Sequence, residues 1–174
     1  MPLSLNRRAA RDVGWLAFML LAIQPAHSAE AQQLPSSSLT VEVAGLKNTA
    51  GQVCFSLFES SEGFPQAEEA VIARQCVAAS TATIESATSA DALEAMAGRL
   101  SVVFEGLESG TYAVSVLHDE NEDSQINTGL FGVPTEGFGF SRNPTIRTSV
   151  PAFREAAVFV LGRRATTQID LIYY

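Results

Sequence analysis

Oxygen-bearing side chains occupy every second position between residues 119 and 127. They are Asp119, Asn121, Asp123, Gln125 and Asn127. Calcium-binding loops use this spacing, at positions 1, 3, 5, 7 and 9, to surround a hard cation with carboxylate and amide oxygens. Four acidic residues lie within 119–123, and without a counter-ion each close pair costs about 1 kcal/mol near a surface. The spacing therefore predicts that this run binds Ca²⁺.

The run departs from the usual calcium loop at two positions. Ser124 stands at position 6, where Gly normally makes the turn, and Leu130 stands at position 12, where a bidentate Glu is usual. Glu136 could fold back to supply the missing carboxylate, and Ile126 is the apolar residue that anchors such loops to a core. The alternative is a solvated acidic loop in which Asp and Asn side chains form Asx turns.

His118, directly before this run, has two possible roles. It continues the face of Tyr112, Val114 and Val116, which predicts a histidine at the edge of the core. As a catalytic base it would need a carboxylate partner such as Asp119 or Glu136. A Ser-His-Asp arrangement would also need a nucleophilic serine, and no serine of this sequence lies in a nucleophile elbow.

Two phenylalanines separated by glycine, Phe138 and Phe140, complete the candidate segment, residues 118–143. Their rings could contact a sugar or a peptide, or they could pack beneath a bent loop. Connections of this length in compact domains are usually functional or disordered, and the apolar residues argue against disorder. Residues 118–143 are therefore the candidate ligand-binding loop.

Period-two alternation of apolar residues predicts the elements that position this loop. The expected strands are 39–43, 52–58, 71–77, 100–104, 112–116, 156–161 and 167–174. Residues 89–98 resemble a short helix with Ser89 as N-cap and Gly98 as its stop. About seven short strands separated by turns predict an all-β, immunoglobulin-like sandwich; the strand order is left open.

Cys54 and Cys76 are the only cysteines. Counted by twos, each falls on the more polar side of its strand, so one cross-strand bridge could join them. In an oxidising compartment such a pair predicts a disulfide. Closing this loop is worth about 3 kcal/mol.

The N-terminal residues have the pattern of a secretory signal. Arg7, Arg8 and Arg11 precede an apolar stretch, and Ala26 and Ser28 supply the small residues before a cleavage site near Ala29. The predicted organisation is a signal peptide (1–28), a flexible leader (29–38) and one β-sandwich domain (39–174). The protein would then be periplasmic or secreted, without membrane insertion of the mature chain.

The charge balance limits the possible partners. The chain carries a formal net charge of −8. Removal of the signal, with three arginines and one aspartate, changes it to −10. Such a surface repels phosphate backbones, which excludes nucleic acid and favours cations.

Two motifs resemble those of a known family. Residues 110–121, Gly-Thr-Tyr-Ala-Val-Ser-Val-Leu-His-Asp-Glu-Asn, and residues 132–141, Gly-Val-Pro-Thr-Glu-Gly-Phe-Gly-Phe-Ser, resemble the uncharacterised bacterial DUF2141 family. Residues 151–156 resemble its later proline-phenylalanine motif. The resemblance extends over about residues 38–174 and implies a secreted bacterial β-sandwich without an assigned activity.

The resemblance also bears on the calcium site. Family members commonly have the loop D-x-N-x-[DN]-G-x-[IL]-D, whereas this chain has Ser124 and Asn127 at the glycine and final aspartate positions. These differences imply a weaker calcium site. The Gly-Thr-Tyr start of the strand also resembles prealbumin-like and carboxypeptidase-regulatory-like modules, which mostly bind or scaffold.

Three functions follow as hypotheses. The first is an exported β-sandwich module, stabilised by calcium, that binds a protein or carbohydrate ligand through residues 118–143. The second is a hydrolase or isomerase that uses His118 with a neighbouring carboxylate. The third is a structural envelope protein. Exposure of His118 in a pocket with a carboxylate would favour an enzyme, and its burial would favour a module.

Overall fold

The computed structural model describes residues 36–82, 98–147 and 149–174. The predicted signal peptide lies outside these residues, as does most of the predicted leader. The predicted helix over 89–98 lies outside them too, except for Gly98, which is the first residue of a strand.

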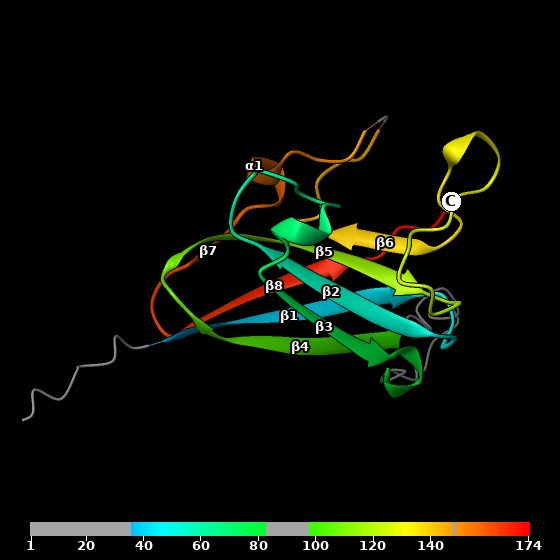
Figure 1. Cartoon of the computed structure of the whole chain (residues 1–174). Coiled ribbons are helices and arrows are strands. Elements are labelled where there is room, and N and C mark those ends of the chain that lie inside the picture. The colour runs from blue at the N-terminus through cyan, green and yellow to red at the C-terminus, as the bar shows by residue number, and fades with distance from the viewer. Residues whose placement is uncertain (1–35, 83–97, 148) are drawn as a thin grey trace, which may run out of the picture. The chain divides into compact units, whose positions relative to one another are not determined.

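Two sheets, in which most neighbouring strands are antiparallel, form the β-sandwich that the alternation predicts (Figure 1). They contain eight strands in the described part of the chain. The first sheet has the order β4-β1-β8. Its strands are β1 (Ser37–Leu46), β4 (Gly98–Leu107) and β8 (Arg164–Asp170). β1 is antiparallel to β4 and parallel to β8. The last strand of the chain therefore lies beside the first.

The second sheet has the order β3-β2-β5-β6, and β7 pairs with the beginning of β5. Its strands are β2 (Gln52–Phe58), β3 (Ala73–Ala78), β5 (Gly110–Asp119), β6 (Gly137–Phe140) and β7 (Val158–Val160). One short helix, α1 (Phe153–Ala156), precedes β7 in the described residues. Figure 1 shows α1 close to β5 and β7.

Two expectations about the elements were wrong. The 118–143 segment is not one loop, because it contains β6 and begins inside β5. β6 has the sequence Gly-Phe-Gly-Phe, in which glycines replace the polar residues of an ordinary alternation. The expected strand over 156–161 is the end of α1 followed by only three strand residues.

The main core lies between the sheets, as the alternation predicts. Tyr112, Val114, Val116 and Ile169 are buried in one cluster, and Leu171 packs half-buried against it. β1 and β4 contribute every second residue to the same cluster, which is what a sheet with one buried face requires.

A second, smaller core covers part of the outer face of the larger sheet. Phe138 and Phe140 of β6 pack there with Ala113 of β5. Phe64 closes over them, with its ring edge-to-face to Phe58 at 5.2 Å between centroids and to Phe140 at 6.0 Å. The segment that follows β2 and the side chains of β6 therefore cover a sheet face that would otherwise be solvated.

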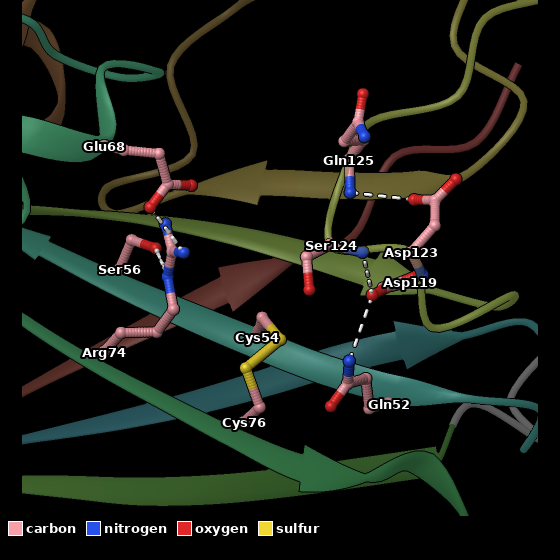
Figure 2. Close-up of a disulfide and its surroundings, with 10 residues drawn as sticks. All are labelled: Gln52, Cys54, Ser56, Glu68, Arg74, Cys76, Asp119, Asp123, Ser124 and Gln125. Carbon is pink, nitrogen blue, oxygen red and sulfur yellow. Dashed lines mark hydrogen bonds and ion pairs between the residues drawn. A yellow bond between two sulfur atoms is a disulfide. The ribbon is translucent and has the colours of Figure 1, made fainter.

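The predicted disulfide is present on the same outer face. Cys54 and Cys76 are register partners on β2 and β3, and their Cα atoms are 4.0 Å apart (Figure 2). The bridge attaches β3, an edge strand, to the centre of the sheet.

Candidate functional site

Asp119 anchors the acidic loop to the sheet. It is the last residue of β5 and its side chain is fully buried. The Nε2 of Gln52 on β2 donates to Asp119 Oδ2 at 3.1 Å, and the backbone N–H groups of Asp123 and Ser124 donate to its two oxygens at 3.1 and 2.9 Å (Figure 2). A carboxylate with three donors is held in one orientation, so the chain turns back over the end of β5.

Asp123 is the centre of the exposed half of the loop. Its Oδ2 accepts hydrogen bonds from the side-chain amides of Asn121 and Asn127, both at 2.9 Å. Its Oδ1 accepts from the Gln125 backbone N–H at 2.8 Å. The Asn127 amide, followed by the Gln125 N–H and the Asn121 amide, lowers the pKa of Asp123, because each donor stabilises the ionised form. The sequence spacing thus brings the five predicted ligands of the run into one network, since the Asp123 N–H also donates to Asp119.

Glu136 returns to the loop and closes it. It is buried, at 4% exposure, and its Oε1 accepts from the Glu120 N–H at 3.1 Å while Oε2 accepts from the Asn127 N–H at 2.8 Å. The two carboxylate oxygens therefore join the beginning and the end of the predicted calcium run. A backbone bridge between Thr128 and Pro134 narrows the loop further.

The two departures from the usual loop have visible consequences. Ser124 adopts the left-handed conformation, with φ 62°, that position 6 requires. Leu130 at position 12 is 84% exposed. In the described residues no three His, Cys, Asp or Glu side chains group closely enough to hold a metal.

The oxygen atoms of these side chains are nevertheless the kind of ligand that a hard cation prefers. Asn121 Nδ2 lies 2.7 Å from Asn127 Oδ1 and 2.9 Å from Asp123 Oδ2, so an amide donor lies between two oxygens that a cation could bind. Rotation of this amide would replace its N–H groups with Oδ1 at the same place.

His118 is fully buried, and both ring nitrogens have partners. Nδ1 lies 2.6 Å from the Tyr173 hydroxyl and Nε2 lies 2.9 Å from the Ala50 carbonyl oxygen. Burial, and to a lesser degree the charge of Glu120, raises the pKa of Tyr173, although the Lys47 N–H opposes this shift. This histidine is a packed residue at the end of the core, and its geometry does not resemble that of a base in a pocket.

The outer face of the larger sheet carries a groove of about 820 Å³ that the sequence pattern does not predict. Its floor includes Cys54, Ser56, Ser115 and Leu117 from β2 and β5. Phe138 and Phe140, for which ligand contact and packing beneath a loop were the two alternatives, also line it, although they are 8% and 7% exposed and pack in the smaller core. Alternation in β2 and β5 predicts an outer face, but the segments that wall it come from distant parts of the chain.

One wall of the groove belongs to the acidic loop itself. Ser124, Gln125 and Ile126 line the groove, and so do Val133 and Pro134 on the returning side of the loop. Two further segments line the groove, with Pro65, Gln66 and Glu68 from one and Ile146, Arg147, Ser149 and Val150 from the other. The acidic loop and the groove are thus parts of one site.

Comparison with known sequences assigns the chain to a family. The profile of DUF2141, described as an uncharacterized protein conserved in bacteria, matches residues 41–169. The chain belongs to this family, as the resemblance of its motifs predicts. No curated protein and no solved structure is similar enough to count as a match. Within the described residues, no helix is long and apolar enough to cross a membrane.

Proposed function

We propose that this protein is an exported binding module whose groove holds a ligand and whose acidic loop binds Ca²⁺. The observation that carries the proposal is that residues 124–126 belong both to the calcium-type loop and to the wall of the groove. A cation held by Asp119, Asn121, Asp123 and Asn127 would fix this wall, and the Gln125 carbonyl and Glu136 are the further ligands available.

Export is supported by two independent features. The sequence begins with a signal-peptide pattern, and the Cys54–Cys76 disulfide is typical of proteins that fold in an oxidising compartment. Calcium sites of extracellular modules are weak, with dissociation constants of about 10⁻⁴ to 10⁻³ M, and the departures of this loop from the usual pattern fit that class.

Burial of His118 favours binding over catalysis. Its nitrogens are occupied by Tyr173 and Ala50, and it is not among the residues that line the groove. The groove, which several chain segments line, also favours the hypothesis of a binding module over that of a purely structural envelope protein.

A melting experiment tests the calcium part of this proposal. At a Ca²⁺ concentration ten times the dissociation constant, mass action adds about 1.4 kcal/mol to the free energy of unfolding. We expect the melting temperature to rise with Ca²⁺ relative to chelator, and we expect Asp123→Asn to remove the rise because a charged ligand is lost. A wild-type protein that melts at the same temperature in both conditions would show that the acidic run is only a solvated loop.

Glu122→Gln is the matched control. Glu122 is exposed, lies at position 4 of the run and forms none of the hydrogen bonds of the network. The substitution removes one negative charge without removing a predicted ligand, so the calcium-dependent rise in melting temperature should persist. Loss of the rise in both variants would indicate a general charge effect and contradict the ligand assignment.

A further inference from the structure

Apolar side chains gather at the rim of the groove. Ile126, Val133, Val150 and Tyr174 line it and are 37%, 43%, 49% and 64% exposed. Exposed apolar side chains that gather around one concavity indicate a binding surface. The volume of about 820 Å³ is within the range of small-molecule sites, which are usually apolar clefts with a few polar groups.

The charges in the groove are unusual for this protein. Glu68, Arg74 and Arg147 are its charged lining residues. Glu68 forms an ion pair with Arg74 at 2.7 Å, and Arg74 Nε also donates to Ser56 Oγ at 3.0 Å (Figure 2). Arg147 is exposed and forms no ion pair with any residue that the structure describes.

The consequence is that Arg147, at an apolar groove in a chain whose net charge is −8, is not paired with any acidic side chain that the structure describes. Glu68, already paired, is the one acidic residue among the lining residues. A cationic head group would therefore find no unpaired acidic side chain among the lining residues, whereas a monoanion would find Arg147. A guanidinium also matches the planar, bidentate geometry of a carboxylate.

We propose that the groove binds an alkyl carboxylate, with its chain over Leu117, Phe138 and Phe140 and its head group at Arg147. This inference deepens the proposed binding function and rests on it. Leu117 and the two phenylalanines are on the outer faces of neighbouring strands β5 and β6, and Leu117 and Phe138 are register partners. Together they provide an apolar part of the floor over which an alkyl chain can lie.

The test is displacement of the fluorescent probe 1-anilinonaphthalene-8-sulfonate from the full-length mature protein. Dodecanoate, dodecyltrimethylammonium and the nonionic dodecyl maltoside would be compared below their critical micelle concentrations. We expect dodecanoate to bind at least tenfold more tightly than the other two. We expect Arg147→Gln to weaken dodecanoate about tenfold and to leave dodecyl maltoside unchanged.

Two further variants make the result specific to the groove. Val133→Glu places a like charge on the exposed wall and should also weaken dodecanoate, without affecting the fold, because Val133 is 43% exposed. Arg163→Gln removes an exposed arginine that does not line the groove, and it should bind as the wild type does. An equal loss in Arg163→Gln and Arg147→Gln would overturn the proposal, because it would reflect net charge alone.

The remaining outcomes separate this inference from the proposed function. Equal binding of all three amphiphiles, unaffected by Arg147→Gln, would overturn the carboxylate assignment and leave a binding module with another ligand. Failure of all three to displace the probe would also overturn the inference. In either case the calcium-dependent melting shift still tests the proposed function, since it does not depend on the amphiphile.

Discussion

Single residues at the end of β5 have roles that their positions predict only in part. The alternation of Tyr112, Val114 and Val116 indicates that His118 is at the edge of the core, where it is buried. The partner of His118 could not be read from the sequence, because Tyr173 is 55 residues away and follows the end of β8. Local alternation encodes the face of the sheet on which a side chain lies. The contact between residues at the ends of two distant strands depends instead on the sheet order.

Removal of the Tyr173 hydroxyl tests the importance of this contact. Tyr173→Phe leaves Nδ1 of the fully buried His118 without its hydrogen-bond partner. An unsatisfied buried group costs about 1–3 kcal/mol, so we expect the free energy of unfolding to fall by this amount in urea denaturation. Tyr174→Phe is the control, because Tyr174 is 64% exposed, and it should unfold as the wild type does. Equal stability of the two variants would mean that water replaces the hydroxyl.

The position-6 serine shows how a departure from a motif affects the backbone. Ser124 has φ 62°, in the region that costs a residue with a Cβ about 1–2 kcal/mol. Glycine avoids this cost but adds about 0.4–1 kcal/mol of conformational entropy to the unfolded chain. The sequence alone indicated the unusual residue, and the structure shows that the turn is kept despite it.

Replacement of this serine should therefore stabilise the protein. We expect Ser124→Gly to raise the free energy of unfolding by about 0.5–1 kcal/mol, the difference between the two costs. Thermal or urea denaturation would measure it. Ser60→Gly is the matched control, since Ser60 is exposed and is not among the residues with positive φ, and it should be slightly destabilising. A lower stability of Ser124→Gly would show that its hydroxyl or Cβ stabilises the loop.

At the scale of elements, alternation predicts the strands that have one buried and one polar face. β2 has the expected bounds, 52–58, and β1, β4 and β5 extend the expected strands by a few residues. β6 escapes this reasoning because both of its faces are buried and every second residue is glycine. The cause is close approach: a Cβ at Gly139 would lie 2.6 Å from Ile169 Cγ2, and one at Gly137 would lie 2.3 Å from the Tyr173 ring.

The close approach of β6 to β8 predicts a large effect for a single methyl group. We expect Gly139→Ala to lower the free energy of unfolding by about 1–3 kcal/mol, because Ile169 is fully buried and the adjacent Asp170 carbonyl is backbone. Gly110→Ala is the control, since its Cβ would meet only the Tyr112 ring at an ordinary 3.4 Å. If both variants unfold at the same denaturant concentration, β6 can move away from β8 without loss.

At the scale of the whole molecule, the acidic balance and the cysteine pair were readable from composition, and the groove was not. Charge and cysteine number are sums over the sequence and need no topology. The groove needs segments that are far apart in the sequence, among them those around residues 66, 116, 125, 134 and 147, to meet over one sheet face. Their meeting follows from the strand order β3-β2-β5-β6, which period-two patterns do not encode.

The disulfide connects this topology to the compartment in which the protein folds. Cys54–Cys76 closes a loop with a sequence separation of 22 and attaches edge strand β3 to β2, in which Cys54 also lines the groove. In the chain-entropy description, loss of this cross-link costs about 3 kcal/mol. We expect Cys54→Ala combined with Cys76→Ala to lower the free energy of unfolding by about this amount in urea.

The reductant dependence distinguishes the cross-link from the side chains that form it. Dithiothreitol should destabilise the wild type towards the double variant and should leave the double variant unchanged, because the variant has no disulfide to lose. If the reductant leaves the stability of the wild type unchanged, the bond is not formed in solution. If the double variant is as stable as the oxidised wild type, the bond forms without constraining the unfolded chain, and the stabilisation of β3 must come from its pairing with β2 alone.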